Sequence, residues 1–267
     1  MIIVQLLGGL GNQMFQYAMA RRLALKHQTA LKLDIAAFQT YTLRFYELGC
    51  FNIAQTFAAS DEKQSLTLIK EPHFHFTRRA LKYPDNVYIE GYWQSEKYFK
   101  DIETTIRQEF WVKEEPAGLN KEIGNEIRNT NSISIHVRRG DYVSNPVTNK
   151  YHGVCSMDYY QACINGLVSR VSDPRFYVFS DDPEWTWENF SLSYPVRFVT
   201  HSGVEKAYED LRLMSLCKHN IVANSSFSWW AAWLNENPDK IVFAPKRWFN
   251  RDELDTSDLI PDSWICK

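Results

Sequence analysis

The sequence has 267 residues, of which 30 are basic and 32 acidic, for a formal net charge of −2. This balance gives no general electrostatic reason to bind nucleic acid or a membrane surface. Hydrophobic residues make up 45% and charged residues 23%, which excludes a disordered chain. The length allows one large domain or two small ones.

Targeting and cross-linking signals are absent from the sequence. Its five cysteines form no CxxC pair, so neither a disulfide framework nor a zinc site is indicated. The N-terminal apolar run is too short for a signal peptide, and no stretch approaches the ~18 apolar residues of a membrane helix. We therefore expect a cytoplasmic protein with no transmembrane segment, and peripheral association with a membrane stays open.

Strand and helix patterns alternate along the chain and are interrupted at residues 114–118. Before this break, we expect strands at 2–7, 30–35 and 87–89 and helices at 13–26 and 96–110, the second capped by Ser95. After it, we expect strands at 132–137, 176–179, 196–199, 220–223 and 241–244, and helices at 119–128, 157–171, 205–217 and 228–235. Such alternation predicts parallel sheets covered by helices. Two lobes with a cleft between them follow, spanning 1–128 and 129–267.

The first motif is GGLGNQ at residues 8–13, between a predicted strand and helix. Open α/β sheets bind ligands at this position, and glycines let the backbone approach a ligand closely. The dinucleotide pattern GxGxxG fails at Met14, and GK[ST] is absent. Asn12 and Gln13 add polar groups, although an ordinary tight turn is the alternative.

The second motif is HVRRGDY at residues 136–142, where a predicted buried strand ends. Alternation places His136 and Arg138 on one side of the strand. A buried guanidinium needs an anionic partner, and its planar fork suits a phosphate. Asp141 would orient an arginine or accept a hydrogen bond from a ligand. The alternative is a structural Arg–Asp pair at a solvated strand end.

The third motif is ANSSF at residues 223–227, a turn of small polar residues before a helix. Ser225, Ser226 and their N–H groups could hold a phosphate at the helix start. Simple capping by Ser226 or Ser228 is the alternative. Two acidic pairs, at residues 181–182 and 209–210, are candidates for nucleotide contacts or ordinary caps. No segment has the spacing of metal ligands.

Together these segments resemble the bacterial α-1,2-fucosyltransferases of glycosyltransferase family 11. The resemblance rests on GGLGNQMFQYA at 8–18, HVRRGDY at 136–142, FSDD at 179–182 and the stretch EDLRLMSLCKHNIVANSSFSWWAAWL that begins at Glu209. These motifs occur in the expected order between residue 1 and about residue 250. Residues 38–85 and 143–155 match no motif, and we expect them to recognise the acceptor.

The resemblance implies a GT-B fold, in which two Rossmann-like lobes enclose the active site. It implies inverting transfer of L-fucose from GDP-β-L-fucose to the 2-hydroxyl of a galactose residue on a glycan, without a metal ion or other cofactor. The C-terminal lobe would bind the donor, and the N-terminal lobe would lie on the acceptor side. The acceptor itself is not readable: lactose, an O-antigen galactose and a longer glycan are all open.

Residue by residue, the resemblance gives the catalytic roles to Arg138, at the donor diphosphate, and to Asn12. Gly11 and Asn12 resemble the first-lobe loop that meets the diphosphate and the fucose. The further substrate contacts that we expect are Gln13, His136, Asp141, Asp182, Asp210, Asn224, Ser225, Ser226 and Phe227. Asp210 would contact guanosine, and Ser225, Ser226 and Phe227 would form the phosphate and nucleoside turn. No residue matches a general base.

Two other classes of protein fit parts of the sequence. A nicotinamide-dependent oxidoreductase would share the α/β alternation, but the failed GxGxxG pattern argues against it. A binding protein without catalytic activity would need only some of the motifs, and here the arginine and serine turns are both present.

Overall fold

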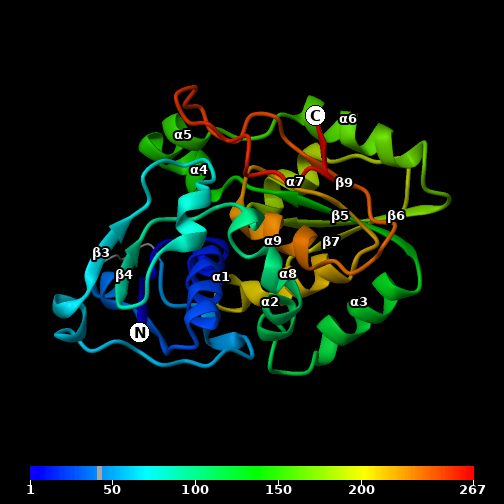
Figure 1. The fold of residues 1–267 in the computed structure, drawn as a ribbon. Coiled ribbons are helices and arrows are strands. Elements are labelled where there is room, and N and C mark those ends of the chain that lie inside the picture. Colours follow the sequence, from blue (N-terminus) through cyan, green and yellow to red (C-terminus); the bar gives the residue numbers. More distant parts are fainter. Residues whose placement is uncertain (41–43) are drawn as a thin grey trace. The chain divides into compact units, whose positions relative to one another are not determined.

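A computed structural model describes residues 1–40 and 44–267, which form two compact units. Unit 1 comprises residues 1–114 and 254–261, and unit 2 comprises residues 115–253 and 262–267. Figure 1 shows the elements along the chain. Residues 41–43, part of the 38–85 stretch expected to recognise the acceptor, lie outside the described residues.

Unit 1 is built on a four-stranded parallel sheet with the order β2-β1-β4-β3. Its strands are β1 (Ile2–Gln5), β2 (Leu31–Asp34), β3 (Thr67–Lys70) and β4 (Val87–Glu90), and its helices are α1 (Leu10–His27) and α2 (Glu103–Glu109). The central strands β1 and β4 are almost wholly buried, as expected for a parallel sheet.

Unit 2 contains a six-stranded parallel sheet with the order β10-β9-β8-β5-β6-β7. The strands are β5 (Asn131–Val137), β6 (Pro174–Ser180), β7 (Val196–Val199), β8 (His219–Ile221), β9 (Val242–Ala244) and β10 (Ile265–Cys266). The helices are α3 (Gly118–Arg128), α4 (Gly140–Ser144), α5 (Pro146–His152), α6 (Met157–Val168), α7 (Pro183–Asn189), α8 (Ala207–Leu216) and α9 (Ser226–Leu234). None of the helices described here is long and apolar enough to cross a bilayer.

The sequence placed the boundary between the lobes too late. Helix α3 belongs to unit 2, which begins at Glu115, so the expected division after residue 128 is wrong. Its buried residues Ile123 and Ile127 explain this, because α3 packs against β5 and α8 of unit 2. The chain also returns to unit 1 at residues 254–261.

The helix expected over 96–110 is interrupted: two short 3-10 turns, at Glu96–Tyr98 and Lys100–Ile102, precede α2. Ser95 does cap the first turn, since its side chain accepts from the N–H of Lys97. The adjacent rings of Tyr98 and Phe99 are both fully buried, one against Trp93 and the other against Phe15. The irregular backbone lets these two neighbouring rings pack in different directions.

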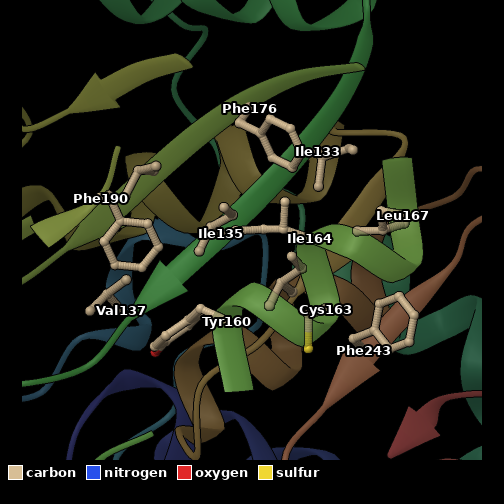
Figure 2. Close-up of a cluster of buried hydrophobic side chains, with 12 residues drawn as sticks. Ile133, Ile135, Val137, Tyr160, Cys163, Ile164, Leu167, Phe176, Phe190 and Phe243 are labelled. Atoms are coloured by element: carbon tan, nitrogen blue, oxygen red, sulfur yellow. The ribbon is translucent and has the colours of Figure 1, made fainter. Parts of the chain in front are cut away.

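The core of unit 2 lies between α6 and one face of the sheet. Figure 2 shows side chains from β5 and β6 packed against Tyr160, Cys163, Ile164 and Leu167 of α6. On β5, Ile133, Ile135 and Val137 alternate with Ser134 and His136, which face the opposite side. This packing therefore determines which side chains of β5 face the core and which face the opposite side of the sheet.

The opposite face of the sheet is organised by Asn220 on β8. Its side-chain amide donates to Ser134 Oγ at 2.8 Å and to the carbonyl of Met214 in α8 at 2.9 Å. Asn235, after α9, donates to Asn220 Oδ1 at 2.7 Å. These buried bonds link β5, β8, α8 and the end of α9.

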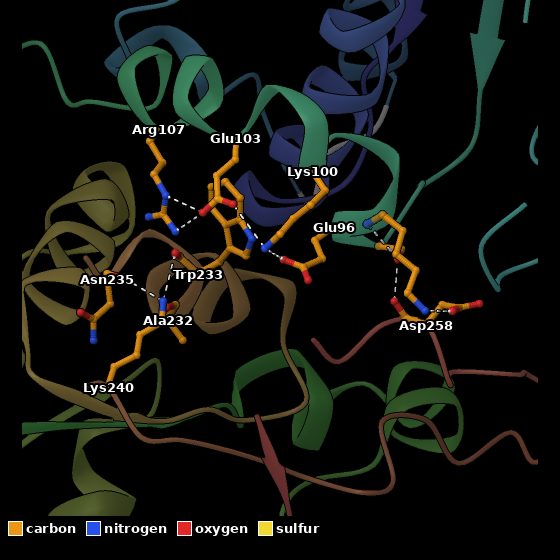
Figure 3. Close-up of polar contacts among 11 residues, drawn as sticks. Glu96, Lys100, Glu103, Arg107, Ala232, Trp233, Asn235, Lys240 and Asp258 are labelled. Carbon is orange, nitrogen blue, oxygen red and sulfur yellow. Dashed lines mark hydrogen bonds and ion pairs between the residues drawn. The ribbon is translucent and has the colours of Figure 1, made fainter. Parts of the chain in front are cut away.

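Helix α9 ends at a bound lysine. Lys240 Nζ donates to the carbonyls of Ala232 and Asn235 at 2.8 Å each and to that of Trp233 at 3.3 Å (Figure 3). A cation at this end satisfies free carbonyls and complements the helix dipole. Within unit 1, Asp258 joins the returning segment to Lys97 and to the backbone N–H of Phe76.

Candidate active site

The strand order of unit 2 indicates which edge of its sheet is the candidate ligand site. Strand β5 leads to β6 on one side, whereas its other neighbour β8 leads away to β9. In open α/β sheets, ligands bind beyond the carboxyl ends of two such diverging strands. The loops that leave β5 and β8 carry the second and third sequence motifs, so the fold brings these motifs to one edge.

Arg138 is the first charged residue beyond β5. Its guanidinium forms ion pairs with Asp141 and, at 2.8 Å, with Asp181, and it lies 5.0 Å from the ring centre of Tyr142. Although burial opposes its charge, Asp181, Tyr142 and Asp141 hold the pKa of Arg138 above its usual value. Arg138 therefore stays a cation. The glycine at position 140 leaves room for Asp181, because a Cβ at this position would collide with the Asp181 carboxylate.

Arg139 takes different partners, as strand alternation predicts. Its side chain pairs with Asp182 at 3.0 Å and stacks on Trp185, with 3.8 Å between guanidinium and ring centre. Asp182 also caps α7 by accepting from the N–H of Trp185. The expected substrate contact Asp182 is thus occupied by bonds within the fold, which agrees with the capping alternative.

His136 lies on β5 beside these arginines and is 5% exposed. Burial, and next the charge of Arg138, lower the pKa of its imidazole to about 3, so the ring is neutral near pH 7. Its Nδ1 has no hydrogen-bond partner in the described part of the chain. The ring centre of Phe227, in the first turn of α9, lies 5.5 Å away. The structure thus brings together two of the expected substrate contacts.

The turn after β8 leads directly into α9. Ser225 is its N-cap residue but makes no side-chain capping bond, and Ser228 donates to backbone carbonyls instead. Ser226 and Ser228, the expected capping residues, both lie within α9, so neither is its N-cap residue. Ser225 and Ser226 stand at the start of this nine-residue helix, where N–H groups favour anions.

Asn224 has a structural function that the sequence did not reveal. Its amide donates to the carbonyls of His152 at 3.0 Å and of Gly153 and Trp248 at 3.2 Å each, and its oxygen accepts from Cys155. With only 2% of its surface exposed, Asn224 holds the surrounding loops together. Both the nitrogen and the oxygen of its amide are used internally, and the expected substrate contact stays a prediction.

Asp210 lies in the first turn of α8. Burial raises the pKa of its carboxyl to about 6, and the hydroxyl of Ser202 donates to it at 2.5 Å. The neighbouring Glu209 pairs with Arg212 and is less exposed. A carboxyl that titrates near neutral pH is a candidate functional group.

In unit 1, the first motif lies beyond β1, next to the end of β4. Gly8 has φ of +77°, and a Cβ there would approach Asn12 Nδ2 to 2.6 Å. The helix begins at Leu10, so Gly11 and Asn12 belong to its first turn. Asn12 Oδ1 accepts from Gln94 Nε2 at 2.8 Å, and Gln94 was missed by the sequence analysis. The one feature of the sequence that could have indicated Gln94 was its position in the turn after the short strand β4.

Gln13, expected to bind substrate, is fully buried instead. Its amide nitrogen donates to the carbonyls of Gly8 at 2.9 Å and Phe45 at 2.8 Å, and its oxygen accepts from the N–H of Glu47 at 2.9 Å. Both ends of the side chain therefore hold the glycine turn and the 45–47 segment in place. Gln13 thus has a structural role, and its contact with substrate stays a prediction.

Other reactive groups do not assemble into a catalytic set in the described residues. Burial raises the pKa of Cys155 to about 11 and lowers that of His152 to about 4, so this pair is no activated nucleophile. No group of three or more His, Cys, Asp or Glu residues within 1–40 and 44–267 could hold a metal ion.

Comparison with known proteins identifies relatives over the whole chain. The profile of Glycosyl transferase family 11 matches residues 1–266. An α-1,2-colitosyltransferase of Escherichia coli is 37% identical, covering 99% of this chain and 98% of that protein. The O-antigen biosynthesis glycosyltransferase WbnK of the same species is 34% identical over 97% of each. Galactoside α-(1,2)-fucosyltransferase 2 of Bos taurus is 27% identical over 86% of this chain and 68% of its own.

Solved structures share the fold at low sequence identity. The fucosyltransferase NodZ from Bradyrhizobium superposes with a TM-score of 0.56 at 14% identity, covering 91% of this chain and 94% of that one. NodZ α-1,6-fucosyltransferase soaked with GDP-fucose gives a TM-score of 0.55 at 16% identity over the same shares. The expected GT-B-like class, with two Rossmann-like α/β units, is confirmed.

Proposed function

Because this chain belongs to glycosyltransferase family 11, we propose that it transfers L-fucose from GDP-β-L-fucose to the 2-hydroxyl of a galactose residue on a glycan. The relatives named as galactoside α-1,2-transferases support the linkage, and the solved fucosyltransferase soaked with GDP-fucose supports the donor. The name of the O-antigen enzyme supports a polysaccharide precursor as the acceptor.

The observation that carries this proposal is the edge of unit 2 where β5 and β8 diverge. It combines a permanent cation at Arg138, a helix start at Ser225 and Ser226, and the ring of Phe227. Cation and helix N–H groups suit a diphosphate, and an aromatic ring suits a nucleoside. Asp210 would accept from the N–H edge of guanine.

The proposed chemistry places developing charge at this edge. Breaking the bond between C1 of fucose and the β-phosphate oxygen leaves negative charge on the diphosphate. Arg138 and the N–H groups at the start of α9 would stabilise that charge without a metal ion. Since Arg138 is paired with Asp141 and Asp181, the diphosphate would replace one carboxylate, and Asp141 in the adjacent turn is the exchangeable partner. Inversion at C1 and the role of Asn12 are part of the same proposal.

A second donor deserves direct comparison because a relative that is 37% identical is a colitosyltransferase. Colitose is L-fucose without its 3-hydroxyl, so the two donors differ in a single group. Transfer of colitose rather than fucose would leave the family, the nucleotide site and the linkage unchanged.

The test is an assay of the purified protein with radiolabelled GDP-fucose and GDP-colitose against a panel of β-galactosides, followed by linkage analysis. We expect fucose on O2 of galactose. Transfer of colitose alone would replace the donor in this proposal, and a product linked at another hydroxyl would overturn the acceptor position.

A further inference from the structure

A buried glutamine in unit 1 carries an acceptor that no described residue uses. Gln94 is 7% exposed, and its Nε2 donates to Asn12 Oδ1 at 2.8 Å. Its Oε1 is buried and lacks a hydrogen-bond partner within the described chain. A buried carbonyl oxygen without a donor is destabilising, so such atoms in native proteins need an explanation.

The turn that holds Gln94 is strained. Trp93 is fully buried and has φ of +56°, a left-handed conformation that a bulky residue rarely adopts. Such strain persists only where the surroundings enforce it, and it gathers at functional sites.

Glu71 enforces this conformation. Its carboxylate follows β3 and accepts from the backbone N–H groups of Tyr92 at 2.7 Å and Trp93 at 2.9 Å. The carboxylate is largely buried, and this burial raises its pKa to about 7. Glu71 thus fixes the backbone of the turn that carries Gln94.

The position of Gln94 is one where parallel sheets bind ligands. Strand β1 leads to β2 on one side, and β4 is its neighbour on the other, so the turns that follow β1 and β4 lie at one edge. The first turn supplies Asn12 and the second supplies Gln94. Their mutual hydrogen bond fixes the orientation of the Gln94 amide, with its oxygen directed away from Asn12.

We propose that Gln94 accepts a hydrogen bond from a hydroxyl group of a substrate sugar and selects substrates that carry that hydroxyl. This inference rests on the proposed function. An amide oxygen can only accept, which excludes an ionised phosphate or carboxylate oxygen and requires an O–H or N–H donor. On the fucose and galactose of the proposed reaction, that donor is a hydroxyl group. Asn12 orients the Gln94 amide, and Glu71 is a positioning residue that acts through the turn.

The hydroxyl belongs either to the transferred deoxyhexose or to the galactoside, and a deoxy-sugar series distinguishes them. We would compare wild type and Gln94→Ala on GDP-fucose against GDP-colitose, and on β-galactosides lacking the 3-, 4- or 6-hydroxyl. Removing the hydroxyl that Gln94 recognises should lower kcat/KM of wild type about 10- to 100-fold, the range of one hydrogen bond in a closed site. The same removal should cost Gln94→Ala little.

Matched variants separate recognition from folding. Gln108→Ala, at an exposed position of α2, should keep the wild-type preference. Glu71→Ala and Glu71→Gln should both lose that preference, because the two N–H bonds end on different carboxylate oxygens and glutamine has only one acceptor oxygen. If Gln94→Ala fails to fold, Gln94→Asn withdraws the oxygen with a smaller change and should show the same loss of preference.

Two results would overturn the inference in different ways. A wild type that loses activity on one deoxy sugar, together with a Gln94→Ala variant that loses the same factor, would remove Gln94 from recognition. Absence of transfer by wild type with every donor and acceptor would mean that the proposed function is wrong, and the inference about Gln94 would be rejected with it.

Discussion

Two consecutive arginines after β5 serve different purposes in the structure. Arg138 stands beside Tyr142 with two acidic partners, whereas Arg139 is held between Asp182 and the ring of Trp185. The sequence predicts their divergence because side chains alternate along a strand. A structural Arg–Asp pair within the motif is one interpretation of the sequence, and Asp141 does pair with Arg138. The sequence does not reveal the second partner, Asp181, because this residue follows the separate strand β6.

Arg138→Lys should keep the charge but lose the planar fork that binds two phosphate oxygens. We expect turnover to fall by about 10²–10³, as for loss of one donor to the transition state. Arg139→Ala should lower thermal stability more than turnover, because it removes the stacking on Trp185. Steady-state kinetics and melting curves check both, and a greater loss of turnover in Arg139→Ala at unchanged stability would contradict the assignment.

The raised pKa of Asp210, about 6, gives a prediction with a defined sign. The folded state favours the neutral acid, so this group lowers stability as pH rises from about 4 to about 6 and has a constant effect above that. If Asp210 accepts from guanine, it must be ionised, and GDP affinity should rise over the same interval. The Asp210→Asn variant should bind GDP more weakly and lose this part of the pH dependence.

Calorimetric titrations at several pH values compare the two proteins. Ionisation of the GDP phosphates affects both equally, so only the difference reports on Asp210. Identical pH profiles for wild type and Asp210→Asn would remove this residue from the nucleotide site.

Among the elements, those with strong hydrophobic patterns were predicted within a few residues. Strands β5 to β9 and helices α1, α3, α6, α8 and α9 all occur near their expected positions. Strand β3 was missed because its residues are mostly exposed at a sheet edge, which hides the apolar signal. Strand β10 is only two residues long.

Short helices near the candidate site were also missed, although two of them carry a readable signal. Helix α5 begins at Asn145-Pro146 and α7 at Asp182-Pro183, and each N-cap side chain accepts backbone N–H bonds. An Asx residue before proline favours a helix start. Applied here, that rule predicts the capping role of Asp182. No local rule predicts Asn224 or Gln94, because their partners are distant in the sequence.

Asn224 should contribute to the folding stability of the protein, because its side chain holds several loops together. Asn224→Ala removes donors to three carbonyl groups, and we expect a loss of about 2–3 kcal/mol in the free energy of unfolding. Denaturant titration checks this, with the exposed Asn165→Ala of α6 as the control. Unchanged stability together with weaker GDP binding would contradict this structural role and support Asn224 as a substrate contact.

At the scale of the molecule, the alternation of strands and helices was sufficient to predict two parallel-sheet units. It was not sufficient to place their boundary, since α3 reads as a polar helix in either lobe and only its packing against β5 and α8 assigns it. Where the active site lies relative to the two units stays a prediction.

Metal independence is a further prediction for the whole protein. Because Arg138 and the start of α9 supply the positive potential, EDTA should leave both GDP affinity and the rate of transfer unchanged. Calorimetry and the transfer assay measure these directly. A loss of binding or turnover on chelation, restored by a divalent cation, would contradict the proposal.

The central claim is that the edge between β5 and β8 holds the diphosphate of a GDP-sugar, and the most direct measurement is a crystal structure of the complex with GDP. We predict the β-phosphate within hydrogen-bonding distance of the Arg138 guanidinium and of the N–H groups of Ser225 or Ser226, with the guanine near Asp210. A GDP molecule bound away from this edge, with Arg138 still paired to both Asp141 and Asp181, would contradict the account.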